Sequence, residues 1–346
     1  MLDFLELLKD NQNLFDIFVA RDEYSCKKDK YGRCLYKYIK NKDVLRPIVS
    51  EYLFKKGFYL EWPDGFKFAV CLTHDIDTIY PSWRYTIFTS LKLLSRFQIK
   101  AGVDRLIAKV SETTKNPFWN FKKIMEIEKS YDAKSTFFFK ATNKDPAGWI
   151  YDIESLKDVL KDISDEGFEI GLHGGYYSFN NPHALLEEKI RLEKVLGRPV
   201  IGIRMHYLRF EIPYTWRMLK DIGFKYDTTF GYPDMPGFRN GICYPFKPYD
   251  LYQKEIIDIL EIPLNVMDNT LFHIGIEKGW EIVKKIIYYT EKYSGVVTIL
   301  WHNTTFDNVF WGNWSKFYNK LLHYLAEKKA WITTAEDIYK YWSKNF

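Results

Sequence analysis

The sequence predicts an α/β protein whose main part is a distorted (β/α) barrel of seven or eight units. Short runs rich in apolar, β-branched or aromatic residues alternate with stretches of helical periodicity. This alternation indicates parallel strands with both faces of the sheet covered. The units extend over about 270 residues, which fits a closed barrel better than an open sheet. An open doubly wound sheet would normally carry a glycine-rich phosphate loop after its first strand, and the sequence has no G-x-G-x-x-G or Walker loop.

Residues 1–62 are predicted to form a separate, mainly helical or irregular N-terminal segment, and residues 63–346 the barrel. We expect the segment to have an accessory role in packing or assembly, because no cluster of polar residues follows a strand within it. It is predicted to contain a short helix, a Lys-rich polar stretch, a second helix and a closing turn, at residues 2–8, 21–42, about 47–55 and 62–65.

Eight strands and at least five helices are predicted within the barrel. The strand-like runs lie at 66–77, 135–139, 168–173, 201–207, 226–230, 257–265, 296–302 and 330–334. Helical periodicity fills the intervals at 156–163, 184–196, 214–222, 280–293 and 314–327. The longer interval 87–130 is expected to hold two helices, broken near Asn116-Pro117.

Composition excludes several classes of protein. Hydrophobic residues make up 47% of the chain and charged residues 27%, which is typical of soluble globular proteins and excludes a disordered chain or a fibre. The net charge of +5 comes from interspersed residues without a long basic run, so no nucleic-acid partner is expected. No apolar run is long enough for a membrane span, and the N-terminus lacks the pattern of a signal peptide. We therefore expect a soluble chain, with a cytoplasmic location if it comes from a bacterium.

Polar residues gather at the ends of the predicted strands. Because the carboxyl ends of parallel strands share one mouth of a barrel, we expect these side chains to meet there. Taken singly, each has a structural explanation, such as a hydrogen-bonded core histidine or a solvated carboxylate. Taken together, they favour a functional site, and two carboxylates that face one side of a strand more often bind a cation or share a proton. The residues concerned are Asp75, Asp77, His173, Arg204, His206, Asp227 and His302.

The order of these residues over about 62–340 resembles the polysaccharide deacetylase family, the NodB-homology domains of carbohydrate esterase family four. The resemblance implies a partial or distorted (β/α) barrel and a divalent metal, often zinc, that serves to remove N- or O-acetyl groups from sugars. Thr73-His74-Asp75-Ile76-Asp77 looks like the first motif, which implies that Asp75 is the base and Asp77 a metal ligand. The stretch 167–171 looks like the lead of the second motif, which implies that His173 is a ligand.

The remaining motifs of the family are matched less closely. Arg204-Met205-His206-Tyr207 is similar to the third motif, which implies that Arg204 holds the base, although a histidine stands at the family's proline position. Asp227 resembles the aspartate of the fourth motif, and Leu300-Trp301-His302 the fifth, whose histidine is an acid that Asp227 would tune. The stretch 237–246 is similar to a subgroup associated with bacterial surface-polysaccharide synthesis.

The second histidine ligand of the family is replaced by Tyr177, a poor ligand for zinc. A catalytic divalent site usually has three protein ligands and one open position. His206 could complete the set, since it ends the neighbouring strand; His74 is the other candidate, although alternation turns it away from Asp77. We favour Asp77, His173 and His206 as ligands of Zn²⁺.

The function that these residues predict is metal-dependent removal of an N-acetyl or related acyl group from an amino sugar in bacterial surface-polysaccharide biosynthesis. Asp75 would act as base and His302 as acid. Two alternatives stay open. One is hydrolysis of another C–N bond, in a formamide or a cyclic amide; the other is a metal-free carbohydrate-binding or scaffold protein of a biosynthetic complex. The substrate, an amino sugar or glycan, is expected to contact Tyr176, Tyr207, Arg209 and Trp301.

Overall fold

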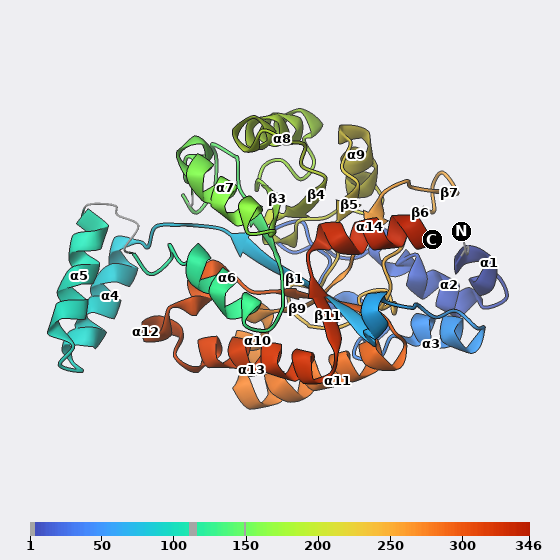
Figure 1. The fold of residues 1–346 in the computed structure, drawn as a ribbon. Helices are drawn as coiled ribbons and strands as arrows, with labels where there is room; N and C mark the ends of the chain where they lie inside the picture. The colour runs from blue at the N-terminus through green and yellow to red at the C-terminus, as the bar shows by residue number, and fades with distance from the viewer. Residues whose placement is uncertain (1–3, 111–115, 149) are drawn as a thin grey trace.

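A nine-stranded sheet forms the centre of the computed structural model, which describes residues 4–110, 116–148 and 150–346 (Figure 1). Eight strands follow one another in the order β8-β5-β4-β3-β2-β1-β10-β9, and β11 pairs with β1. Every pairing in this sheet is parallel. The strands are β1 (Phe68–Ile76), β2 (Thr136–Phe139), β3 (Glu169–Gly174), β4 (Gly202–Met205), β5 (Tyr226–Asp227), β8 (Leu260–Glu261), β9 (Leu264–Met267), β10 (Val296–Leu300) and β11 (Ala330–Thr333). The prediction of an α/β distorted barrel is confirmed.

The central strand β1 is buried along its whole length, because it has neighbours on both edges and helices over the sheet. β10 pairs with Ala69 to Thr73 on one edge. The other edge is shared in succession, by β11 beside the first half of β1 and by β2 beside the second half. The carboxyl end of β1 is thereby held between β2 and β10, at the mouth of the barrel.

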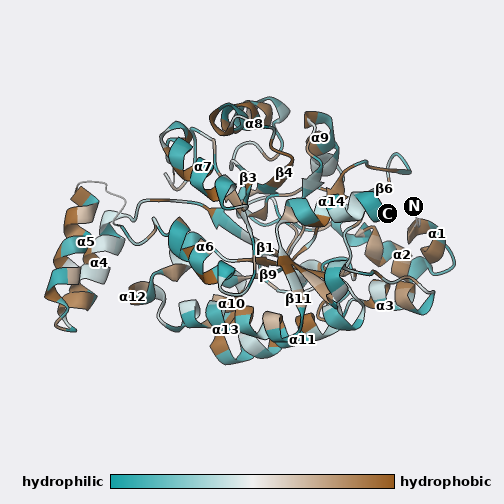
Figure 2. Ribbon diagram, in the orientation of Figure 1, coloured by the Kyte–Doolittle hydropathy of each residue, from teal (hydrophilic) through white to brown (hydrophobic). Residues whose placement is uncertain are grey.

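Helices cover the outside of the sheet in the order that alternating strands and helices require. They are α6 (Phe121–Lys129), α7 (Lys157–Asp165), α8 (Pro182–Leu196), α9 (Tyr214–Ile222), α11 (Ile276–Lys292), α13 (Asn313–Glu327) and α14 (Ala335–Asn345). Apolar residues concentrate along the interior strands in Figure 2, whereas the outer faces of these helices are mainly polar. Among the helices of the described residues, none combines the length and the apolar character needed to cross a bilayer.

Helix α8 shows how local sequence sets the ends of these helices. Its first residue is Pro182, whose ring is already suited to the helical φ, and the side chain of Asn181 accepts a hydrogen bond from the N–H of Ala184. The helix ends at Leu196, and the next residue, Gly197, adopts the left-handed conformation (φ 74°) that glycine reaches without steric cost.

The structure differs from the sequence prediction in three respects. The interval 87–130 holds three helices, α4 (Trp83–Leu94), α5 (Ile99–Val110) and α6, and residues 111–115 lie outside the described chain. The predicted strand 257–265 is two short strands, β8 and β9, separated by Pro263, which has no N–H to donate to a neighbouring strand. Helix α14 was not predicted, nor were several shorter elements: α2 (Gln12–Phe18), β6 (Tyr249–Asp250), β7 (Glu255–Ile256), α10 (Asp268–Ile274) and α12 (Asn308–Trp311).

The N-terminal segment contains α1 (Phe4–Leu8), α2 (Gln12–Phe18) and α3 (Ile48–Lys55). Its apolar side chains belong to the same hydrophobic core as those of the barrel. A buried ion pair between Glu23 and Arg239 joins the two parts, with Arg239 Nε 2.8 Å from Glu23 Oε1. Cys26 and Cys34 form a disulfide bond, which the cysteine spacing did not predict.

Glu169 on β3 makes the stability of the fold depend on pH. Its buried carboxylate accepts hydrogen bonds from Thr136 Oγ1 (2.6 Å), Tyr226 Oη (2.6 Å) and the N–H of Glu336 (2.8 Å). Burial raises the pKa of Glu169 to about 7 in spite of these bonds, whereas the ordinary value is 4.5. Between these two pH values the folded protein keeps a proton that the unfolded chain releases. The free energy of unfolding should therefore fall by up to about 3 kcal/mol as the pH rises through this window.

Replacing Glu169 with glutamine should remove this part of the pH dependence. The amide oxygen can accept from Thr136 and Glu336, and the amide nitrogen can donate to the Tyr226 hydroxyl. We expect Glu169→Gln to lose less stability than the wild type between pH 5 and pH 8 in urea unfolding. Glu166→Gln is the control, because Glu166 is an exposed partner of Lys129. Equal pH dependence of the wild type and Glu169→Gln would contradict the assignment.

Candidate active site and metal centre

A cavity of about 260 Å³ opens at the carboxyl ends of the strands. Most of the residues predicted to meet at the mouth of the barrel lie in or against it. It is lined by Tyr31, Arg33, Asp75, Asp77, His173, His206, Tyr207, Leu208, Pro233, Met267, Asn269, His273, Leu300 and His302.

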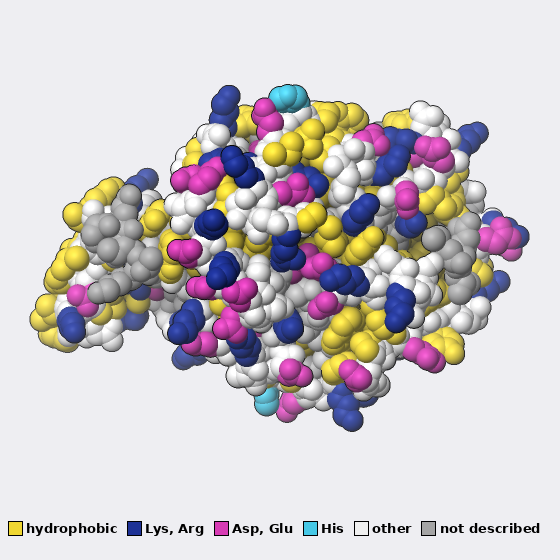
Figure 3. All heavy atoms as spheres, turned by 45° about the horizontal axis from the view of Figure 1, so that its top comes forward, with side chains coloured by type: hydrophobic (Ala, Val, Ile, Leu, Met, Phe, Trp, Pro, Cys, Tyr) yellow, Lys and Arg dark blue, Asp and Glu magenta, His cyan; other side chains and the backbone are white. Residues whose placement is uncertain are grey.

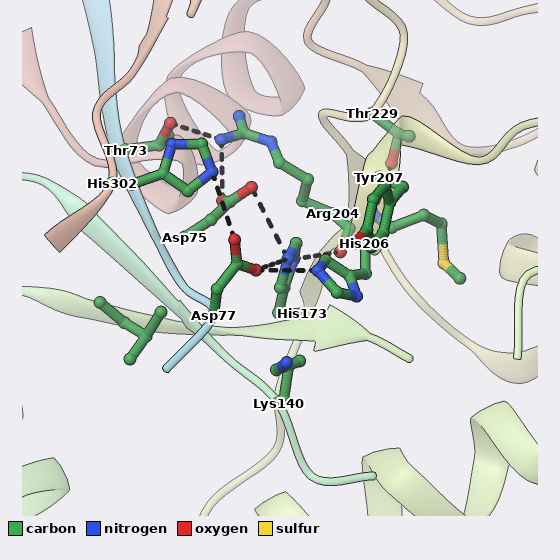
Figure 4. Close-up of polar contacts among 12 residues, drawn as sticks. Thr73, Asp75, Asp77, Lys140, His173, Arg204, His206, Tyr207, Thr229 and His302 are labelled. Carbon is green, nitrogen blue, oxygen red and sulfur yellow. Dashed lines mark hydrogen bonds and ion pairs between the residues drawn. The ribbon is translucent and has the colours of Figure 1, made fainter. Parts of the chain in front are cut away.

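Asp77, directly after β1, is the centre of the site (Figure 4). Its Oδ1 lies 3.2 Å from Nε2 of His173, at the end of β3, and 3.0 Å from Nε2 of His206, directly after β4. One donor atom from each residue lies within 4.8 Å of the others, so the three side chains could share a metal ion. Burial by itself raises the pKa of Asp77, but His206, His173 and His302 hold that pKa well below its ordinary value.

The second nitrogen of each imidazole faces an oxygen atom that can accept a hydrogen bond from it. His173 Nδ1 lies 2.9 Å from the carbonyl oxygen of Arg204, and His206 Nδ1 lies 3.2 Å from Oδ2 of Asp145. A proton on each Nδ1 leaves the Nε2 lone pair directed at the point between the side chains. Burial lowers the pKa of His173, which favours the neutral form that binds metals, whereas Asp77 and Asp145 raise the pKa of His206 in spite of its burial. This outer arrangement is typical of metal-ligating histidines, and the two nitrogens and one carboxylate fit a divalent cation such as Zn²⁺.

Asp75 lies beside this cluster and is held by Arg204. Asp75 Oδ1 accepts a hydrogen bond of 3.2 Å from Nη1 of Arg204, while Oδ2 lies 3.8 Å from Nε2 of His173. Arg204 is fully buried and also donates to Thr73 Oγ1 (2.6 Å) and Thr228 Oγ1 (2.8 Å). With its guanidinium bound on several sides, Arg204 can orient one oxygen of Asp75 and leave the other directed toward the cluster.

His302, after β10, approaches Asp77 from the opposite side, with Nε2 3.6 Å from Asp77 Oδ2. Its Nδ1 lies 2.7 Å from Oδ1 of Asp268, and Oδ2 of Asp268 accepts from the His302 N–H (2.8 Å) and from Thr305 Oγ1 (2.7 Å). Burial lowers the pKa of His302, but Asp268, followed by Asp77 and Asp75, raises it overall to about 10. His302 is therefore protonated at neutral pH, as a general acid requires.

The structure pairs His302 with Asp268, and not with Asp227, which was predicted to tune it. Asp227 is fully buried on β5, accepts a hydrogen bond of 2.6 Å from Thr229 Oγ1 and lies against Glu261, and burial raises its pKa. β10 pairs with β9, which leads directly into Asp268, whereas β5 lies on the far side of β1. The sequence offered one indication of this pairing, because Asp268 is an acidic residue that follows closely after the predicted strand 257–265.

The prediction that Trp301 contacts substrate is wrong. Successive side chains of an extended chain point in opposite directions, so Trp301 faces away from the cavity that His302 enters. Its indole is fully buried and stacks on Phe317, with ring centroids 5.7 Å apart.

Tyr207 is the predicted aromatic contact that lines the cavity. Its ring stacks on Tyr31 of the N-terminal segment, with centroids 4.9 Å apart. Arg33 donates a hydrogen bond of 2.8 Å from Nη1 to the carbonyl oxygen of Tyr207. Tyr31 and Arg33 were missed, since only the fold brings them beside strand ends from other parts of the chain.

Tyr176 and Arg209 were predicted to contact substrate and are not among the cavity's lining residues. The guanidinium of Arg209 lies over the rings of Tyr176 (4.1 Å) and Phe179 (3.7 Å). It also donates to the carbonyl oxygens of Tyr31 and Tyr176. Arg209 therefore connects the loop that contains Tyr31 to the loop that contains Tyr176.

The alternative ligand His74 lies outside the cluster. It is fully buried, with Nε2 2.6 Å from Glu128 Oε1 and Nδ1 2.6 Å from the carbonyl oxygen of Trp301. Both nitrogens are therefore occupied by protein groups on the other face of β1. Tyr177, at the family's second histidine position, is half exposed and packs edge-on against Tyr176.

Comparison with known proteins identifies the fold of the chain. No family model matches the sequence, and no curated protein matches it. Solved structures do match, and they show that the chain has the fold of the polysaccharide deacetylases, as the order of motifs predicted.

The structures in question are two polysaccharide deacetylases and one allantoinase. A putative polysaccharide deacetylase from Mycobacterium smegmatis matches with a TM-score of 0.55 and 17% identity, over 82% of this chain and 92% of that one. Puue allantoinase matches with a TM-score of 0.55 and 15% identity, over 92% and 99%. A probable polysaccharide deacetylase from Pseudomonas aeruginosa PAO1 matches with a TM-score of 0.54 and 14% identity, over 83% and 95%.

Proposed function

We propose that the protein is a metal-dependent hydrolase that removes the acetyl group from an acetamido sugar. One observation carries this proposal: the cluster of Asp77, His173 and His206 lies between a carboxylate held by arginine and a histidine held by aspartate. Amide hydrolysis needs these three elements, an electrophile for the amide oxygen, a base for water and an acid for the leaving amine. The motif order that resembles polysaccharide deacetylases supports a sugar as the substrate.

The roles of the residues follow from their positions. A divalent cation held by Asp77, His173 and His206 would polarise the amide oxygen and increase the acidity of water. Asp75, oriented by Arg204, accepts the proton of the attacking water. His302, kept protonated by Asp268, donates a proton to the amine nitrogen as the C–N bond breaks. The backbone N–H of Tyr207 is the proposed donor to the developing oxyanion, and the rings of Tyr31 and Tyr207 support the sugar.

The size of the cavity limits what it can enclose. At about 260 Å³, it lies below the range of roughly 300–1,000 Å³ that is usual for drug-sized ligands. One sugar ring with its acyl group is therefore the part of the substrate that we expect inside, with any nucleotide, lipid or polymer attached to it outside. A role in surface-polysaccharide synthesis in the bacterial cytoplasm is part of the same proposal.

A release assay tests the chemistry directly. Purified protein, supplied with Zn²⁺ or Mn²⁺, would be incubated with N-acetylated and N-formylated nucleotide amino sugars and with a cyclic amide, since an allantoinase shares the fold. We expect acetate release, which Asp75→Asn should abolish. Formate release or ring opening in its place would identify a different C–N bond. Absence of bound metal and of all three activities would instead indicate a carbohydrate-binding protein.

A further inference from the structure

Helices α4 and α5 form a hairpin that projects from the body of the protein (Figure 1). The two helices pack mainly against each other. At the base, the hydroxyl of Tyr85 donates to Asp307 (2.6 Å), and Arg105 binds the same carboxylate through both Nη atoms (2.6 and 2.7 Å). The hairpin is thus fastened to the loop that follows His302, at the end of the barrel that carries the site.

Small side chains and Leu93 are buried in the hairpin, and Leu94 packs on Gly102, whereas most of the other large apolar side chains are exposed. Ser90, Gly102 and Ala108 are buried, and a Cβ atom on Gly102 would lie 3.1 Å from the carbonyl oxygen of Ser90. The exposed side chains include Phe88 (53%), Leu91 (60%), Phe97 (91%), Ile99 (63%), Ile107 (58%) and Val110 (71%). Yellow side chains accordingly line the outer edge of the projecting lobe in Figure 3. Helices of water-soluble proteins usually bury their large apolar side chains, whereas helices in lipid commonly pack against each other through small residues.

The hairpin also contains the whole net charge of the protein. Residues 83–110 include six Lys or Arg and one Asp, a balance of +5, which leaves 44 basic and 44 acidic residues in the rest of the chain. Arg105 is neutralised by Asp307, while Arg84, Arg96 and Lys100 are exposed. The tip, Arg96-Phe97-Gln98-Ile99-Lys100, places two large apolar side chains between two cations.

We propose that this hairpin anchors the protein to an anionic lipid bilayer, with its apolar edge inserted at the level of the headgroups. Each helix has 12 residues, too few to span a membrane, so the hairpin lies in the interface. Charge selects the lipid surface over a second copy of the chain. Two copies would bring two sets of positive charge together, whereas anionic headgroups would neutralise them.

Vesicle co-sedimentation of the full chain tests the anchor. We expect binding to vesicles of phosphatidylcholine with phosphatidylglycerol, little binding to phosphatidylcholine alone, and loss of binding at high salt. Each cation near an anionic surface contributes about fivefold to binding, so Arg84→Gln/Arg96→Gln/Lys100→Gln should weaken binding on the order of 100-fold. Ile99→Gln/Ile107→Gln should weaken it as well, because it removes the inserted side chains.

The matched control is Ile190→Gln/Lys194→Gln on α8, where both side chains are exposed outside the hairpin. This variant should bind vesicles as the wild type does. Binding that does not depend on phosphatidylglycerol, or that falls equally in the α8 control, would overturn the proposal. A second result would also overturn it: a dimer, seen in sedimentation velocity, that dissociates in Ile99→Gln/Ile107→Gln but stays intact when vesicles are added. The hairpin would then be a subunit interface.

Discussion

His206→Ala should release the divalent cation from the folded protein. His206 supplies one of three donor atoms, and its Nε2 lies 3.0 Å from Oδ1 of Asp77. Loss of an outer partner such as Asp145 typically weakens metal binding by about 10- to 100-fold, and loss of a ligand should cost more. We expect metal analysis of the protein, purified without chelator, to find about one ion per wild-type chain and almost none in His206→Ala.

Two controls separate loss of the ligand from a general disturbance of the site. Tyr177→Phe should keep the metal, because that ring lies outside the cluster. His302→Ala should also keep it, since its partners are Asp268 and the far oxygen of Asp77. Full metal content in folded His206→Ala would show that the three ligands assigned here are wrong.

His302→Ala should lower turnover by roughly 10²–10⁴-fold, the usual contribution of a general acid or base. The imidazolium that donates this proton from Nε2 is stabilised by the carboxylate of Asp268, whose Oδ1 lies 2.7 Å from Nδ1. Asp268→Asn should therefore reduce turnover as well, because the amide keeps much of the shape but not the charge. The measurement is kcat for acyl release at saturating metal, on variants whose metal content equals that of the wild type.

Asp227→Asn is the informative control for this prediction. Asp227 matches the family motif but faces Thr229 and Glu261, so its neutralisation should leave kcat close to that of the wild type. If Asp227→Asn lowers kcat and Asp268→Asn does not, the sequence motif is the better guide and the pairing of His302 with Asp268 is not catalytic.

Sequence pattern was sufficient for the fold class and for the centre of the candidate site. Apolar runs alternating with helical periodicity predicted a parallel barrel, and strand ends of such a barrel share one mouth. Asp77, His173 and His206 each follow or end a strand, so their meeting could be anticipated from local sequence. The period of two along a strand also turned His74 away from Asp77, as the structure shows. The same period could have excluded Trp301, which directly precedes His302.

Tertiary structure decided which residues support this centre. Asp268 reaches His302 because β9 lies beside β10, and a local sequence pattern does not predict the order of strands in a sheet. Tyr31 and Arg33 enter the cavity because the N-terminal segment packs on the barrel through a shared core. In the α4–α5 hairpin, the two helices approach each other closely at small residues, and this contact leaves the apolar edge facing outward. Helical periodicity shows that an apolar face exists, but it does not show whether that face packs on a core or faces solvent. These three features depend on contacts between segments that are distant in the sequence. Such contacts follow from the free energy of the whole fold and not from any local sequence pattern.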